Sequence, residues 1–114
     1  MKEIELNELL LSKFPELKKN FEEETSWQDG LNTGCIVTFE DVFMPLFEKA
    51  VDTNNENLLK RISIFIEELS NIDDDYVQNV FYIAILENIS SYKNKEKFIT
   101  CLLTNSKRIY TENF

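Results

Sequence analysis

The densest group of chemically active side chains in the sequence is a set of carboxylates at Glu67, Glu68, Asp73, Asp74 and Asp75. Carboxylates gathered in this way can bind a divalent cation or present negative charge to a basic partner. The three aspartates can equally begin a helix, because anionic side chains stabilise a helix N-terminus by about 0.3–1 kcal/mol. The two roles are compatible, since one aspartate can cap the helix while its neighbours face outward. We therefore predict that these five carboxylates contribute to a partner-binding surface.

A second candidate surface lies earlier in the chain, where Glu22-Glu23-Glu24 precedes Trp27 and Asp29. It joins negative charge to a large amphipathic ring, and tryptophan is over-represented among the residues that dominate protein interfaces. However, a lone tryptophan in a chain with nine phenylalanines is more often a core or lid residue. Both interpretations of Trp27 stay open, and we include Trp27 and Asp29 among the predicted partner-binding residues.

The sequence lacks histidine and closely spaced cysteines, on which the commonest catalytic and zinc sites depend. It contains no histidine, the commonest general base and a common zinc ligand. Its two cysteines, Cys35 and Cys101, cannot form a Cys-x-x-Cys pair. The segment from Asp52 begins like a calcium loop but has Asn57 where glycine is required and Ser63 where a closing glutamate is required. We accordingly predict a protein that is not an enzyme and that uses no metal and no cofactor.

Charge is the most unusual bulk property of the 114-residue chain. It has 21 acidic and 12 basic side chains, which gives a formal net charge of −9. The acid is concentrated in the first four-fifths, whereas residues 93–114 carry five basic and two acidic side chains. A negative field repels phosphate backbones and anionic membranes but attracts basic proteins and speeds their encounter. We predict a basic protein partner, no binding of nucleic acid or membrane, and a monomer or weak homodimer.

The elements that must position these residues are helices. Apolar residues recur at spacings of three and four, and only two glycines and two prolines interrupt the chain. We predict an all-α fold, a single compact bundle of five to six helices over residues 1–114, with partly antiparallel hairpins. The expected helices span residues 3–14, 15–25, 39–52, 55–70 and 73–92, followed by a last helix that begins after Asn94. Pro45 should kink or divide the third, and residues 25–38 should form an ordered loop, with a β-hairpin at Asp29-Gly30 as the alternative.

The expected compartment is the cytoplasm. No apolar run approaches the roughly 18 residues of a membrane span, and the start Met-Lys-Glu-Ile-Glu lacks the cationic and apolar regions of a secretory signal. Cys35 and Cys101 fit free thiols better than a disulfide framework, although the sequence leaves a bridge between them open.

Helical segments such as Val77-Gln78-Asn79-Val80 through Ile85-Leu86-Glu87 occur in a small, acidic chain rich in Asn, Lys and Ile. Over residues 39–104 the chain thereby resembles the small acidic helical immunity proteins that bacteria pair with polymorphic toxins. The resemblance implies a bacterial inhibitor that neutralises a cognate basic toxin, such as a nuclease, by blocking its active cleft. It assigns no role to any individual residue.

Two other classes of function remain open. A helical adaptor or regulatory module would bind a partner peptide or helix in an exposed apolar groove larger than a few hundred Å². An enzyme that uses only carboxylates and a metal would bring several acidic side chains together inside a pocket.

Overall fold

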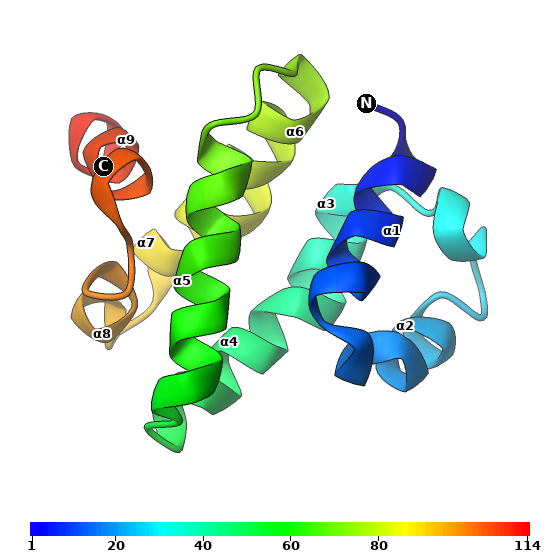
Figure 1. Ribbon diagram of the computed structural model, residues 1–114, viewed down its shortest axis with the longest axis horizontal. Coiled ribbons are helices and arrows are strands. Elements are labelled where there is room, and N and C mark those ends of the chain that lie inside the picture. Colours follow the sequence, from blue (N-terminus) through cyan, green and yellow to red (C-terminus); the bar gives the residue numbers. More distant parts are fainter.

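The helical pattern of the sequence is realised along almost the whole chain. The computed structural model describes residues 1–114 and contains helices joined by turns, with no strand (Figure 1). Its elements are α1 (Glu3–Lys13), a 3₁₀ turn (Pro15–Leu17) that runs into α2 (Lys18–Glu24), a second 3₁₀ turn (Gly30–Asn32), α3 (Cys35–Thr38), α4 (Met44–Asp52), α5 (Glu56–Ser70), α6 (Asp75–Val80), α7 (Glu87–Ser91), α8 (Lys95–Ile99) and α9 (Thr104–Asn113). The π-helical stretches Phe39–Phe43 and Phe81–Leu86 join α3 to α4 and α6 to α7. None of the helices has both the length and the apolar character needed to cross a membrane.

The all-α prediction is confirmed. Because α3 is continuous with α4, and α6 with α7, the structure has seven continuous helices rather than the five or six predicted. The additional segment arises at the C-terminal end, where one predicted helix is in fact two. α8 ends at Ile99, and the chain turns before α9 begins at Thr104. The hydroxyl of Ser106 accepts the N–H of Leu103 at 3.0 Å, which satisfies a donor at the start of the new helix.

Residues 25–38 do not form a single loop, and no β-hairpin forms there. Hydrogen-bonded turns extend to Thr33, and a helix begins at Cys35. Gly34 precedes that helix with an extended backbone, and the apolar run that follows buries Cys35, Thr38 and Phe39. Burial at helical spacing therefore overrides the two glycines that suggested a loop.

Pro45 does not divide the helix that contains it. The chain stays helical from Cys35 to Asp52, and Pro45 occupies the first turn of α4. The π-helical stretch directly before Pro45 supplies the irregularity that a proline kink was expected to produce.

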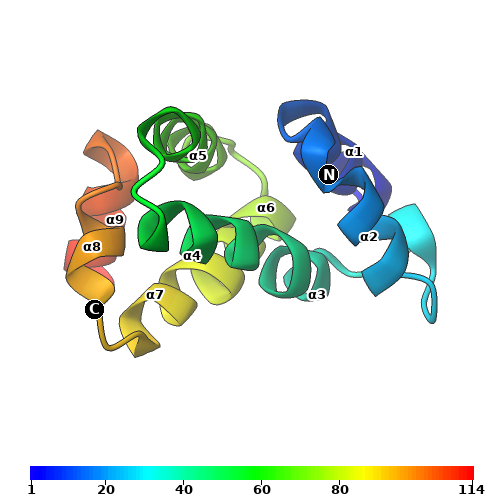
Figure 2. The ribbon, with the colours of Figure 1, turned by 90° about the horizontal axis from the view of Figure 1, so that it is seen from below.

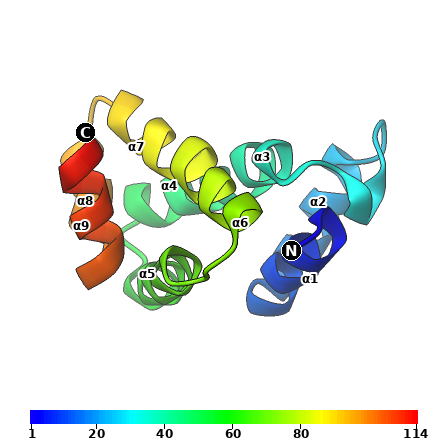
Figure 3. The same ribbon diagram turned by 90° about the horizontal axis from the view of Figure 1, so that it is seen from above.

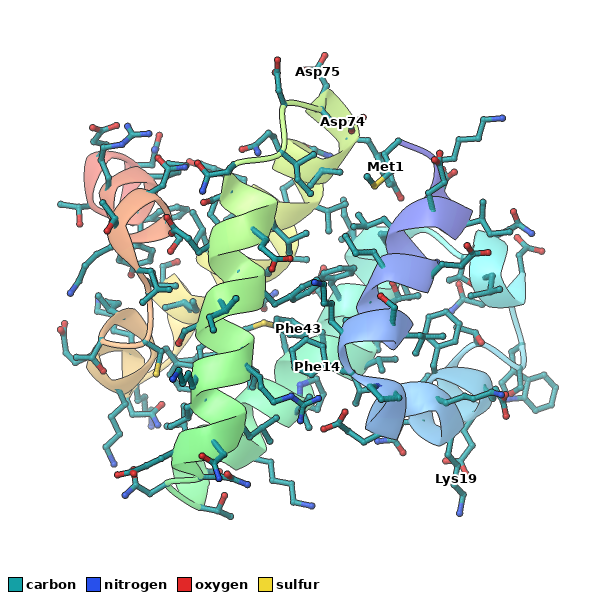
Figure 4. All side chains as sticks on the ribbon, in the orientation of Figure 1. Met1, Phe14, Lys19, Phe43, Asp74 and Asp75 are labelled. Carbon is teal, nitrogen blue, oxygen red and sulfur yellow. The ribbon has the colours of Figure 1, made fainter.

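The core is one contiguous cluster of 26 buried hydrophobic residues centred on phenylalanine rings. Phe14, at the end of α1, and Phe43 point towards each other into the space between α1 and α5 (Figure 4). Together with Phe39 and Phe65 they form ring pairs whose centroids lie 5.3–6.2 Å apart. Aromatic pairs at such separations stabilise a core beyond their buried area. These rings hold the N-terminal elements against the rest of the molecule.

The remaining helices are arranged around α5. After a turn at Thr53 and Asn54, α5 folds back across α4, and α7 lies on the far side of α4 (Figure 2). α6 packs beside the C-terminal end of α5. Asn55 caps α5 by accepting the N–H of Leu58 at 3.2 Å. The α1–α2 region and the α8–α9 region lie at opposite ends of the molecule (Figure 3). The acidic N-terminal elements are thus separated from the basic C-terminal ones.

Candidate partner-binding surface

Glu67 points from α5 towards the start of α9. Its two carboxylate oxygens accept the backbone N–H of Ser106 at 2.9 Å and of Asn105 at 3.0 Å. Both donors lie in the first turn of α9, where no intrahelical acceptor exists for them. Burial is the largest influence on this carboxyl and alone would raise its pKa, but the hydrogen bonds from Ser106 and Asn105 together lower the pKa below its ordinary value. Glu67 therefore acts as a charged cap that holds α9 against α5.

Glu68 and Asp74 also have partners within the chain. Glu68 faces the opposite direction from its neighbour, with an oxygen 3.3 Å from Nζ of Lys13 in α1. Asp74 caps α6 by accepting the N–H of Val77 at 3.0 Å, and it forms an ion pair with the amino group of Met1 (Figure 4). The hydrogen bonds from that amino group and from Val77 lower the pKa of Asp74. These two carboxylates, like Glu67, already stabilise the fold.

Asp73 and Asp75 are the members of the predicted acidic group that remain free. Both are exposed, and neither side chain takes part in a hydrogen bond or ion pair. The five carboxylates do not form one cluster, because the side chains on α5 diverge towards α9 and α1 while the aspartates lie beyond the end of that helix. Nowhere in the structure do three acidic or cysteine side chains converge in a way that could hold a metal ion.

Trp27 is exposed over 94% of its surface, in sharp contrast to the phenylalanines. Eight of the nine phenylalanine side chains are buried, so the interpretation of Trp27 as a core or lid residue is wrong. An indole that is buried in a contact removes about 150–250 Å² from water, which corresponds to about 4–6 kcal/mol at about 25 cal/mol per Å². Folding gains none of this stabilisation, and the full apolar surface of the ring stays available to a partner.

Hydrogen bonds on both sides of Trp27 hold its turn in place. On the N-terminal side, the buried hydroxyl of Thr25 donates to the Phe21 carbonyl at 2.6 Å, and the N–H of Gln28 reaches back to the Thr25 carbonyl at 3.0 Å. On the C-terminal side, the N–H of Asn32 donates to the Asp29 carbonyl at 3.0 Å, and Gly30 adopts a φ of +55°. A left-handed residue of this kind lets the chain reverse where other residues would be strained. Trp27 is therefore displayed on an ordered turn.

A buried asparagine in α1 anchors the same segment to the core. Asn7 is fully buried, and its Nδ2 donates to the carbonyls of Leu31 and Thr33, each at 2.9 Å. Its Oδ1 accepts the hydroxyl of Thr38 at 2.7 Å and the thiol of Cys35 at 3.4 Å. A buried amide satisfied from three segments fixes their relative positions, because breaking any of these bonds leaves a polar atom without water. Asn7 thus positions the Trp27 turn and the start of α3 together.

The residues that precede and follow the exposed indole in the chain are rich in unpaired acid. Residues 22–29 contain four carboxylates and no basic side chain, and all four are exposed. None of Glu22, Glu23, Glu24 and Asp29 belongs to any of the four ion pairs in the structure. The end of α2 and the turn that follows it thus expose an indole and four unpaired carboxylates within eight consecutive residues. We call residues 22–29 the Trp27 surface; of these residues, Thr25 alone is buried.

A hollow of about 230 Å³ lies beside the Trp27 surface, between α1, α2 and the second 3₁₀ turn. Its wall is formed by Leu11, Lys18, Phe21, Glu22, Thr25, Gly30 and Leu31. The three large apolar side chains come from three different elements, so no spacing in the sequence indicates that they share a site. Leu11 belongs to the apolar pattern of α1, but only the fold shows that its side chain lines this hollow.

Arg61 forms a second feature that sequence patterns do not indicate. Its guanidinium lies 5.1 Å from the ring centroid of Phe14 and donates to both carboxylate oxygens of Glu16, at 2.6 and 2.8 Å. The same group donates to the carbonyl of Lys13 at 3.0 Å. The two hydrogen bonds that Arg61 donates to Glu16 are the main reason why the pKa of Glu16 is lowered. Arg61 therefore connects the end of α1 to α5 and stabilises the fold.

The two cysteines are free thiols in the structure. Cys35 is buried, and burial raises the pKa of its thiol; Cys101 is half-buried, and burial raises the pKa of that thiol too. Thiolate is the reactive form of cysteine, so neither environment activates the sulfur as a nucleophile.

The sequence was compared with known protein families, curated proteins and solved structures. Residues 7–114 match the model of a domain of unknown function, DUF7674. No curated protein and no solved structure matches the chain. Because the family match extends over nearly the full length, the protein belongs to the DUF7674 family.

Proposed function

We propose that this protein is a protein-binding inhibitor, an immunity protein that neutralises a basic toxin domain by covering its active cleft. The observation that carries the proposal is the amount of uncompensated acid on the exterior. Of 21 acidic side chains, four belong to ion pairs, and the net charge is −9. A field of this sign accelerates encounter with a cationic surface and weakens as ionic strength rises.

A nuclease is the toxin class that best fits this chemistry. A nuclease cleft is lined by cationic groups that bind phosphates, and carboxylates on a rigid scaffold can occupy it in place of a nucleic acid. The inhibitor would act in the bacterial cytoplasm, where thiols such as those of this chain stay reduced.

The distribution of exposed apolar side chains favours an inhibitor over an adaptor. The large exposed ones are Met1, Trp27, Val37, Ile64, Leu103 and Phe114, and none of the hollows in the structure is lined by more than three hydrophobic residues. A peptide-binding groove would instead gather apolar side chains along one continuous face.

Gene context and co-expression test the proposal. The reading frame immediately upstream should encode a large secreted protein with a variable C-terminal domain. We expect that this domain alone arrests growth when it is expressed inside a bacterial host, and that co-expression of the present protein restores growth and yields a complex that weakens at high salt. Continued arrest, with no complex even at low salt, would reject the inhibitor proposal.

A further inference from the structure

We infer that the Trp27 surface is the contact site of the inhibitor, and that Trp27 inserts into an apolar pocket bordered by Lys or Arg side chains on a basic protein partner. This inference rests on the proposed function and assigns it to a particular part of the molecule. It joins three properties of residues 22–29: an exposed anchor, an ordered backbone and unpaired negative charge.

The anchor is the indole itself. Trp27 is 94% exposed although the chain buries eight of nine phenylalanines, so apolar side chains in this protein normally reach the core. Tryptophan is among the residues that most often dominate binding energy, because a single ring fills a pocket completely.

The ordered backbone reduces the loss of conformational freedom on binding. The turn is closed by hydrogen bonds that Thr25 and Asp29 accept, and Asn7 ties the next residues to α1. A side chain presented on such a turn binds more tightly than the same side chain on a mobile loop, since less ordering is needed at the moment of contact.

The charge around the indole specifies the partner. Four exposed carboxylates without intramolecular partners repel an anionic surface and pair with cations that border an apolar pocket. The hollow beside the turn adds apolar surface from Leu11, Phe21 and Leu31. Lys18 and Glu22 both line its wall, so the preference for a cationic partner comes from the four carboxylates of residues 22–29 and not from the hollow.

The other acidic surface is less suited to this role. Around α5 and α6, Glu67, Glu68 and Asp74 are already bound within the chain, and Asp73 and Asp75 have no exposed aromatic residue beside them in sequence. The two exposed aspartates nevertheless provide a matched control, since neutralising them removes as much charge as neutralising two glutamates next to Trp27.

The test uses the C-terminal domain encoded by the upstream reading frame as the probe, titrated with the unmodified inhibitor and four variants. We expect Trp27→Ala to weaken binding about 30-fold or more, which corresponds to the 2 kcal/mol that defines a dominant interface residue. The double variant Glu23→Gln/Glu24→Gln should weaken binding several-fold at low salt, whereas Asp73→Asn/Asp75→Asn should have a smaller effect at the same net charge. Trp27→Phe should restore part of the affinity.

A second measurement reports on the indole directly. Because Trp27 is the sole tryptophan, fluorotryptophan incorporated into this protein gives one fluorine NMR signal, whatever the probe domain contains. We expect the signal to shift when the domain is added. A complex with unchanged affinity in Trp27→Ala, or with an unshifted signal, would overturn the contact site but leave the inhibitor proposal intact. Failure to form any complex would overturn both.

Discussion

Replacement of Glu67 by glutamine tests whether this carboxylate stabilises the fold. Glutamine keeps the size of the side chain, but its single carbonyl oxygen can accept only one of the two N–H groups of α9, and its own NH₂ group then faces the other donor. The loss of one charge-assisted hydrogen bond at a half-buried helix start should cost about 1–2 kcal/mol. The entropy of unfolding is about 2.1 cal/mol/K per residue, so for 114 residues we expect Tm to fall by about 4–8 °C.

The matched control is Glu68→Gln, which changes the adjacent residue by the same chemistry. The side chains of Glu68 and Lys13 are each 43% exposed, and surface ion pairs of this kind contribute about 0–1 kcal/mol. Thermal unfolding followed by circular dichroism should therefore separate the two variants clearly. Equal Tm values for Glu67→Gln and Glu68→Gln would refute the capping role of Glu67.

The pH dependence of the same variant provides an independent check with a defined sign. The pKa of Glu67 is lower in the folded protein than the ordinary value of 4.5, so the folded state favours the ionised form. Its contribution to stability is present above pH 4.5 and is lost as the pH falls through the folded-state pKa. The difference in Tm between wild type and Glu67→Gln should therefore shrink below pH 4.5, and a difference that grows on acidification would contradict the assigned hydrogen bonds.

Three further predictions concern the buried residues. Asn7→Leu should destabilise the protein by about 2–4 kcal/mol, because the carbonyls of Leu31 and Thr33, the thiol of Cys35 and the hydroxyl of Thr38 all lose their partner. It should also speed hydrogen exchange at Thr33, and unchanged exchange would show that Asn7 does not anchor the turn. Phe43→Ala should cost about 3–5 kcal/mol in denaturant unfolding, as expected for a phenylalanine at the centre of an aromatic cluster, and a cost below about 1 kcal/mol would contradict that position. In the native protein Cys101 should react with a thiol reagent faster than Cys35, whose side chain is fully buried, and the two should become equivalent in denaturant.

The acidic residues illustrate why local interpretation of charge is incomplete. The sequence predicted a helix beginning at the Asp73-Asp74-Asp75 run, and Asp74 does cap it, because a cap depends on residues three positions apart. Glu67 could not be interpreted in the same way, since the donors that it binds are 38 and 39 residues away. A carboxylate on a helix surface carries no local signal that distinguishes a long-range cap from a free charge.

Trp27 is a residue whose burial or exposure could not be predicted from its neighbours in the sequence. Its neighbours in the sequence indicated an acidic segment, but they could not show whether the ring lies inside or outside. The outcome depends on Asn7, which binds the carbonyls of residues 31 and 33 and so draws the segment after Trp27 into the core while the turn itself stays outside. Glycines at positions 30 and 34 suggested a loop, whereas tertiary burial of Cys35 and Thr38 starts a helix there.

The sequence by itself determined the all-α class, the cap at the start of α6 and the excess of negative charge, because each of these follows from residue spacing within about one or two helical turns or from composition. Only the tertiary structure decided that Glu67 and Glu68 diverge, that Arg61 clasps Glu16 over Phe14, and that Trp27 stands exposed among unpaired carboxylates. These contacts join residues that are far apart along the chain, and their formation depends on how whole helices pack.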